Sequence, residues 1–203
     1  MHKNLTVPIP DDAIAALKVG DAVTLNGIIV TGRDAAHKFL LEHFIQRAPA
    51  AEERALYDEL KRLLQGGVIY HCGPVVREIA GGWEFVAAGP TTSIREEGYQ
   101  ADVIAHFGLK AVLGKGGMGA RTLKACQEHN AVYLHAIGGA ATLIAQSVKE
   151  VVGVHKLEFG VPEAMWVIRV EDLPCVVTMD SHGGSVHADV LAVSEARFKQ
   201  LVG

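Results

Sequence analysis

The chain has 203 residues, of which 49% are hydrophobic and 6% aromatic, and its formal net charge is −4. This length and this aliphatic composition suit one sizeable α/β domain and argue against a disordered or fibrous chain. No Lys/Arg block is present, which argues against a nucleic-acid-binding protein.

Neither the N-terminal residues nor the most apolar stretch carries a membrane signal. Residues 1–8 lack the apolar core of a signal peptide. Residues 131–148 include His135, Gln146 and a Gly138-Gly139 break, so we expect a buried strand, turn and helix there and no membrane span.

The three cysteines, Cys72, Cys126 and Cys175, are far apart and never form a CxxC pair. We therefore expect no disulfide framework and a reducing compartment, the cytoplasm. The spacing also gives no sign of a zinc or iron–sulfur ligand set. Cys72, which follows an apolar run, is interpreted as a buried structural residue in preference to a reactive thiol.

The first half of the chain is predicted to be rich in strands. Asn26-Gly27 separates two apolar runs, which is the strongest short signal for a β-hairpin. Asp34 is expected to cap the helix that follows it, and Gly66-Gly67 to end the next one. Strands are predicted at residues 22–25, 28–30, 68–70 and 75–79, and helices at residues 35–46 and 52–64, after an extended start at 5–10 and a helical turn at 14–17.

The second half alternates between strands and helices, which implies parallel pairing with right-handed crossovers. We therefore predict a single α/β domain over residues 1–203. Strands are predicted at residues 83–88, 111–113, 132–134, 166–170 and 175–179, and helices at residues 96–107, 120–129, 140–146 and 190–201.

The segment Gly89-Pro90-Thr91-Thr92-Ser93-Ile94-Arg95 is expected to join a buried strand to a helix. Its three hydroxyl groups can cap the helix, and the N–H groups of the first turn, together with Arg95, can bind an anion. Capping alone would explain an isolated Thr-Thr-Ser. Two further basic residues at similar junctions favour the anion site.

Arg33, Arg95 and Lys115 each lie near a point where a strand leads into a helix, beside Gly or a small hydroxyl residue. Ligands of α/β sheets bind at that end of the strands. Arg can hold a carboxylate through two parallel hydrogen bonds, and Lys acts as a point charge. Taken singly, each is more often a surface charge. Together they predict a cleft for a small dicarboxylate.

Other motifs are weaker. Residues 114–117, Gly-Lys-Gly-Gly, lack the Walker A spacing, so a nucleotide site is not expected. The hydroxyls of Thr91, Thr92 and Ser93 are candidate proton-transfer groups or oxyanion donors, but Thr is a poor base unless a neighbour activates it, and no activator is evident. His182 and His187, with nearby aspartates, are interpreted as a solvated turn, with a weak metal site as the alternative.

Five motifs in this order resemble the β region of the iron–sulfur-dependent hydro-lyases, the family of class I fumarase and L(+)-tartrate dehydratase. The resemblance extends from about residue 5 to residue 180. It implies a swivelling β/β/α domain whose parallel or mixed sheet is flanked by helices. The motifs are Thr31-Gly32-Arg33-Asp34-Ala35-Ala36-His37, Ile69-Tyr70-His71-Cys72-Gly73-Pro74, Gly89-Pro90-Thr91-Thr92-Ser93, Gly114-Lys115-Gly116-Gly117-Met118 and Ile137-Gly138-Gly139.

In that family the β region is fused behind an α region or made as a separate β subunit, and the α part holds a [4Fe–4S] cluster. The resemblance thus implies an α-subunit partner, an (αβ)2 hetero-oligomer and no cluster bound by this chain alone. The reaction it implies is hydration of fumarate to L-malate or dehydration of tartrate to oxaloacetate. The open iron would act as a Lewis acid on the substrate carboxylate and the leaving hydroxyl.

The resemblance also implies roles for individual residues. Thr91 would remove the carbon-bound proton, activated by an Asp of the α part. Arg33, Arg95 and Lys115, with Thr92, would bind the substrate carboxylates.

One departure concerns the residues after Arg95, where the family usually continues with Met and a small polar residue. Glu96-Glu97-Gly98 stand here instead. Two carboxylates suit the first turn of a helix, but they could alter the charge of the pocket. The choice between fumarate, tartrate and another hydroxy diacid stays open. So do two rival functions: a non-catalytic anion-binding or assembly module, and a self-sufficient hydratase with a metal at His182 and His187.

Overall fold

The computed structural model describes residues 2–202, and its main feature is a seven-stranded mixed sheet. In the order in which they lie side by side, its strands are β1 (His2–Thr6), β2 (Ala22–Thr31), β3 (Val68–Tyr70), β6 (Ala111–Gly114), β7 (Val132–His135), β9 (Met165–Met179) and β8 (Val148–His155). Two further strands, β4 (Val75–Ile79) and β5 (Gly82–Ala87), form a separate hairpin. The helices are α1 (Asp11–Ala15), α2 (Asp34–Leu40), α3 (Arg54–Leu64), α4 (Glu97–Phe107), α5 (Ala120–His129), α6 (Ala141–Ala145) and α7 (Val186–Val202), with short segments η1 (Leu41–Ile45), η2 (Ala51–Glu53), η3 (Ser93–Glu96) and η4 (Leu157–Phe159).

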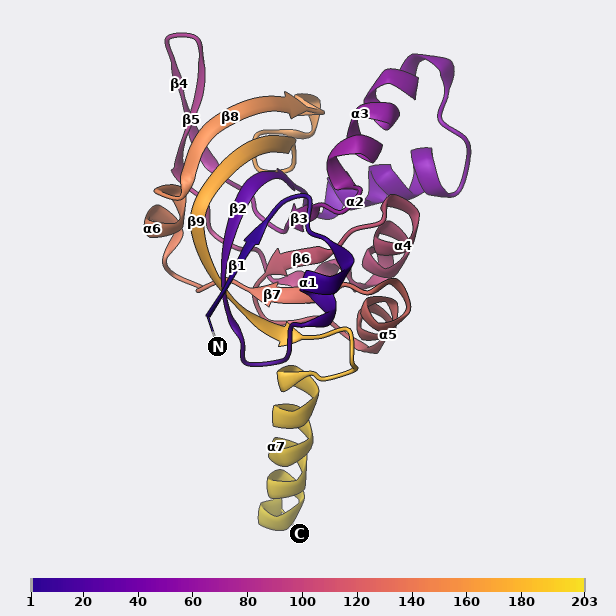
Figure 1. Cartoon of the computed structure of the whole chain (residues 1–203), viewed down its shortest axis with the longest axis vertical. Helices are drawn as coiled ribbons and strands as arrows, with labels where there is room; N and C mark the ends of the chain where they lie inside the picture. The colour runs from indigo at the N-terminus through magenta and orange to yellow at the C-terminus, as the bar shows by residue number, and fades with distance from the viewer. Residues whose placement is uncertain (1, 203) are drawn as a thin grey trace.

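The sheet is partly closed on itself, because β2 pairs with β9 as well as with β1 and β3. β2, β3, β6 and β7 run parallel, whereas β9 runs antiparallel to both β2 and β7. Figure 1 shows the long β9 curving around one side of the molecule. The carboxyl ends of the four parallel strands therefore lie at one edge of the sheet, where ligands of such sheets usually bind.

Both faces of the central strands are covered, which explains their continuous apolar sequence. Successive side chains of a strand point to opposite faces. Thus Tyr70 and Leu113 belong to one core cluster, whereas their neighbours Ile69 and Val112 belong to another that includes residues of α2, α3, α4 and α5. Figure 1 shows these four helices together on one side of the sheet.

The predicted hairpin at Asn26-Gly27 is wrong. β2 continues through these residues with β1 parallel on one side and β9 antiparallel on the other. A shift of register between Leu25 and Gly27 marks a bulge, and Gly27 has a φ of +108°. The Asn-Gly preference for positive φ thus produces a β-bulge, because long-range pairing on both edges keeps the strand extended.

The predicted strand at residues 83–88 is confirmed as β5, and helical segments η3 and α4 follow it, but its interpretation as a buried strand of the parallel sheet is wrong. β5 pairs antiparallel with β4 and stands outside the main sheet. Trp83 and Phe85 pack edge-on against Trp166, whereas Glu84 and Val86 are exposed. One apolar face of this hairpin covers the core, and the other faces solvent.

Several boundaries differ from the prediction. β9 is one long strand that continues through Asp172, whose φ is +52°, so the two expected strands at 166–170 and 175–179 are joined. β8 was not predicted. Asp34 is the first residue of α2, not its cap, and makes an ion pair with Arg95. After Leu40 the helix continues as the π-helical η1.

Most other elements match the prediction, including β3, β6 and β7 and the helices α3, α4 and α5. The prediction of a parallel or mixed sheet flanked by helices is therefore confirmed. Within residues 2–202, no helix is both long and apolar enough to cross a membrane. The prediction of one domain over residues 1–203 includes Met1 and Gly203, which lie outside the described residues.

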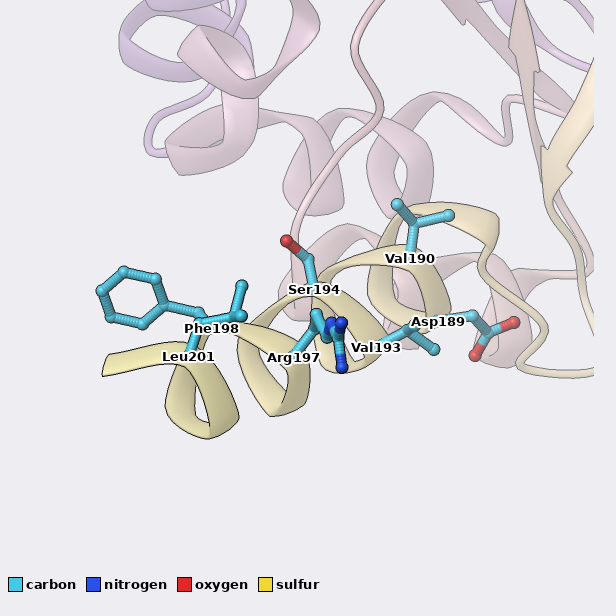
Figure 2. Close-up of a pocket in the computed structure, with 7 residues that line it drawn as sticks. All are labelled: Asp189, Val190, Val193, Ser194, Arg197, Phe198 and Leu201. Atoms are coloured by element: carbon cyan, nitrogen blue, oxygen red, sulfur yellow. The ribbon is translucent and has the colours of Figure 1, made fainter. Parts of the chain in front are cut away.

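The C-terminal helix α7 extends away from the sheet, and none of its described side chains is buried (Figure 1). Figure 2 shows a surface hollow along this helix, which contains none of the predicted site residues. Its lining residues are Asp189, Val190, Val193, Ser194, Arg197, Phe198 and Leu201.

Candidate active site

The segment Gly89–Ser93 lies between the carboxyl ends of β3 and β6. Thr91 N–H donates to the His71 carbonyl oxygen at 2.6 Å, and the Thr91 carbonyl oxygen accepts from Lys115 N–H at 3.3 Å. Ser93 N–H donates to the Lys115 carbonyl oxygen at 2.9 Å. Through these backbone hydrogen bonds the segment pairs with the residues that follow β3 and β6, as a short strand would. Thr91 and Thr92 therefore lie at the edge where the parallel strands end.

The hydroxyl groups of Thr91 and Thr92 do not cap a helix. Thr92 is the N-cap residue of η3 but makes no capping hydrogen bond through its side chain. Within residues 2–202, neither hydroxyl has a hydrogen-bond partner, and Thr91 is half-buried while Thr92 is exposed. The capping interpretation is therefore wrong for both residues, and their hydroxyls are open to a ligand.

Ser93 has a structural position. Its buried Oγ accepts a hydrogen bond from the Tyr133 hydroxyl at 2.8 Å and lies 2.8 Å from His71 Nδ1. A Cβ at Gly114, the last residue of β6, would lie 1.9 Å from this oxygen. Only glycine at residue 114 leaves room for the serine hydroxyl, which anchors the segment to β3, β6 and β7.

A buried chain of hydrogen bonds links the backbone of Arg33 to Ser93. His37 Nδ1 lies 3.0 Å from the Arg33 carbonyl oxygen, and His37 Nε2 lies 3.0 Å from the side-chain amide of Gln100. The same amide lies 2.8 Å from His71 Nε2, and His71 Nδ1 bonds to Ser93. The network joins the ends of β2 and β3 to the segment that precedes α4.

The protonation states in this network follow from burial. Burial lowers the pKa of His37, and burial together with the nearby His37 lowers the pKa of His71 well below its ordinary value. Both rings are therefore neutral near pH 7. Because the Arg33 carbonyl can only accept, His37 carries its proton on Nδ1, and its Nε2 needs a donor. As placed, Gln100 turns its Oε1 to both rings and leaves Nε2 without a partner within residues 2–202. We therefore assign the amide in the opposite orientation, with its NH2 group toward the rings.

The three predicted cations lie at the same edge of the sheet. Arg33 follows β2 and pairs with Glu163 at 3.2 Å, and Arg95 pairs with Asp34, the residue after Arg33. Lys115 follows β6, next to Thr92 in a parallel bridge. Within the described residues, the Lys115 amino group makes no ion pair or hydrogen bond. Its aliphatic chain passes beside Gly138, after β7, 3.6 Å from where a Cβ of that residue would lie.

The two glutamates that depart from the family pattern have different environments. Glu97 accepts hydrogen bonds from the backbone N–H of Gly119 at 2.8 Å, of Arg121 at 3.0 Å and of Thr122 at 3.2 Å. Its carboxylate therefore caps the N-terminus of α5, where the helix dipole also favours negative charge. Glu97 thus has a structural role that its position in the sequence did not reveal.

Glu96 is fully buried, and neither of its carboxyl oxygens has a hydrogen-bond partner within residues 2–202. Burial, reinforced by the negative charge of Asp34, raises the pKa of Glu96 to about 7 against the opposing effects of its backbone N–H, Arg95 and Arg33. This carboxyl group therefore changes its charge near neutral pH, in the residue that follows Arg95.

His182 and His187 do not converge. His182 Nε2 lies 2.9 Å from the Ala15 carbonyl oxygen, whereas His187 Nε2 lies 3.0 Å from Thr178 Oγ1. Asp180 accepts three backbone N–H groups within and next to the turn. Across residues 2–202, no three His, Cys, Asp or Glu side chains are placed to hold a metal ion. The cluster is best described as a hydrogen-bonded turn.

Sequence reasoning missed several members of the site: His37, His71, Gln100, Tyr133 and Glu163. Most could not be identified from the local sequence; His37 and Gln100, for example, occupy the inner faces of helices, where an apolar residue is usual. His71 could have been identified, since it directly follows a strand at the ligand-binding edge, just as Lys115 does. The Glu163–Arg33 pair joins residues 130 positions apart, so no local pattern could indicate it.

Comparison with known sequences identifies relatives of the chain. The sequence model of the family described as Fumarase C-terminus matches residues 2–190. A protein named fumarate hydratase class I from Geobacillus stearothermophilus is 53% identical over 197 residues, which cover 97% of this chain and 35% of that relative. The L(+)-tartrate dehydratase subunit beta of Escherichia coli (strain K12) is 39% identical over 190 residues, covering 93% of this chain and 88% of that subunit. The chain thus spans about a third of the first relative and most of the second.

Proposed function

The chain belongs to the Fumarase C-terminus family, and on this premise we propose that it is the β-type part of a hydro-lyase that acts on a small dicarboxylate together with an α-type partner. The observation that carries the proposal is the pairing of Thr92 with Lys115 at the edge of the sheet. It sets two unpartnered hydroxyl groups beside a cation that no described residue neutralises.

Binding of the substrate is assigned to the three cations. Lys115 is the first contact for a carboxylate, because it has no competing partner within residues 2–202. Arg33 and Arg95 each use part of their guanidinium group in an ion pair. Since a guanidinium carries five N–H donors, both can also bind a second carboxylate, and Thr92 can donate its hydroxyl to the first.

Proton transfer is assigned to Thr91, whose hydroxyl would take the proton from the substrate carbon. A threonine hydroxyl needs an adjacent base to act in this way. Within the described residues, no carboxylate or imidazole hydrogen-bonds to the Thr91 hydroxyl, and His71 Nδ1 is used by Ser93. We therefore propose that the activating carboxylate comes from the α-type partner.

The iron–sulfur cluster is proposed to lie on that partner as well, because the residues of this chain do not fit it. All three cysteines are buried, and burial raises the pKa of Cys72, Cys126 and Cys175 to about 12. Such groups stay thiols at neutral pH, whereas iron ligation requires thiolates.

Two substrates are candidates. The 53% identity to a protein named for fumarate favours fumarate hydration. The match to 88% of a β subunit named for L(+)-tartrate favours tartrate dehydration. Both substrates offer two carboxylates to the same cations, so groups that contact the two central carbons must discriminate between them.

The test is reconstitution. The chain is produced with an α-type partner, assembled without oxygen, and assayed for loss of fumarate and for formation of oxaloacetate from L(+)-tartrate. We expect the pair to turn over one of the two diacids and this chain alone to turn over neither. Binding of both diacids by the pair without turnover would instead favour the non-catalytic module.

A further inference from the structure

Glu96 is a buried carboxyl group with no use in the proposed reaction. It ends η3 and is fully enclosed, without a hydrogen-bond partner for either oxygen among the described residues. An ionised carboxylate in such a position costs several kcal/mol unless other charges compensate it. Two cations are available to compensate it: Arg95 is the preceding residue, and it pairs with Asp34, the residue after Arg33. The charges of Arg95 and Arg33 both favour the ionised form of this carboxyl.

The groups around Glu96 leave its ionisation closely balanced. Burial and Asp34 favour the neutral form, whereas the backbone N–H of Glu96, together with Arg95 and Arg33, favours the charged form. Tyr133, on β7, is neutral, and the charge of Glu163 is paired with Arg33. The buried His37 and His71 are neutral near pH 7, as argued above, and add no charge.

The same guanidinium groups are those assigned to a substrate carboxylate. A charged Glu96 and a bound dicarboxylate would therefore compete for electrostatic interaction with Arg33 and Arg95. Gln100, about one helical turn after Glu96, likewise has one end of its buried amide without a partner.

We propose that Glu96 is a positioning residue whose ionised carboxylate offsets the positive charge of Arg33 and Arg95. Binding of a dicarboxylate is therefore coupled to uptake of one proton by Glu96. The identity of the ligand in this inference rests on the proposed function. The ligand's negative charge raises the proton affinity of Glu96, and the protonated side chain leaves both guanidinium groups to the ligand. Affinity is consequently higher below neutral pH than above it.

Proton uptake distinguishes this role from a purely structural one. Binding of succinate, which cannot react, is measured by titration calorimetry on the assembled α–β complex in two buffers of different ionisation enthalpy. For the wild type we expect net uptake of protons between about pH 7 and 8, falling towards zero below about pH 6, where Glu96 is already protonated. This measurement needs no variant.

The variant Glu96→Gln keeps the shape of the side chain and cannot ionise. We expect it to bind succinate without proton uptake, and about tenfold more tightly than the wild type at pH 8.5, since one pKa unit corresponds to a factor of ten. The matched control is Glu158→Gln, an exposed carboxylate that pairs with Lys156. It should take up protons like the wild type.

The outcomes separate the two claims. Succinate binding by the wild type without proton uptake, or equal uptake by Glu96→Gln, would overturn the role of Glu96 and leave the proposed dicarboxylate site intact. Failure of the complex to bind succinate, fumarate or tartrate would overturn the dicarboxylate site and with it this inference. A destabilised Glu96→Gln with unchanged uptake would identify the residue as structural only.

Discussion

Thr92 and Lys115 pair as neighbours in a parallel β-bridge, although they are 23 positions apart in the chain. The bridge is flanked by backbone hydrogen bonds from Lys115 N–H to the Thr91 carbonyl and from Ser93 N–H to the Lys115 carbonyl. A segment that leaves the β4–β5 hairpin is thereby inserted between two strands of the main sheet. This insertion places a hydroxyl pair and a cation together at the edge where a ligand would bind.

The first prediction concerns the Lys115 charge. Lys115→Met keeps the aliphatic chain beside Gly138 and removes the cation, so we expect the KM of the assembled complex for its diacid to rise about tenfold to hundredfold, the value of one charge-assisted hydrogen bond. Lys124→Met, on the exposed face of α5, is the matched control and should leave KM unchanged. Equal KM values for both variants would remove Lys115 from the site.

The second prediction concerns the space at Gly114. Gly114→Ala would bring a methyl group against Ser93 Oγ, so we expect a loss of about 2 kcal/mol in the free energy of unfolding, typical of overpacking in a core. Gly98→Ala is the control, because a Cβ at this position of α4 meets no atom within 4 Å. It should be neutral or stabilising by up to about 1 kcal/mol. Urea unfolding of this chain alone measures both changes.

The third prediction concerns the cap that Glu97 provides for α5. Glu97→Ala leaves the N–H groups of Gly119, Arg121 and Thr122 without this acceptor, and we expect a loss of about 1–2 kcal/mol in the free energy of unfolding. Glu128→Ala removes only an exposed ion pair of the same helix and should change stability by less than about 0.5 kcal/mol. Similar values for the two variants would contradict the capping role.

The fourth prediction concerns the pH dependence of stability. The pKa of His71 is depressed in the folded chain, so the unfolded chain binds the proton first as the pH falls below about 6.5. The contribution of neutral His71 is therefore complete above that pH and is lost below it, at up to about 1.4 kcal/mol per pH unit. His71→Leu should lessen this acid sensitivity, while His129→Leu, on an exposed residue, should not. Urea unfolding between pH 7.5 and 5.5 provides the comparison.

Periodicity in the sequence was enough to predict the central elements. Apolar runs such as Val68–Tyr70 and Ala111–Leu113 are buried on both faces, so their composition alone indicates strands of a covered sheet. Asn26-Gly27 was misinterpreted because its neighbours on the sheet are distant in sequence. Residues 83–88 were misinterpreted because they pair with the adjacent β4 and stay outside the main sheet. Local preference for a turn at Gly27 yields to pairing with β1 and β9 on both edges.

The site could be predicted only in part. Arg33, Lys115 and the Thr91-Thr92 pair follow or join strand ends, and this position is visible in the sequence. The buried partners Gln100 and Glu163 depend on which helix and loop pack over those ends, which the sequence pattern does not reveal. For the same reason, adjacent Glu96 and Glu97 appeared equivalent, although one is buried beside two arginines and the other caps α5.

The most direct test of the proposed function replaces the Thr91 hydroxyl in the assembled α–β complex. We expect Thr91→Ala to lower kcat at least about a hundredfold, the usual contribution of a proton-transfer group, and to bind succinate as tightly as the wild type. Thr91→Ser, which keeps the hydroxyl, should retain a substantial part of the activity. Turnover by Thr91→Ala at the wild-type rate would contradict the assignment of proton transfer to this residue.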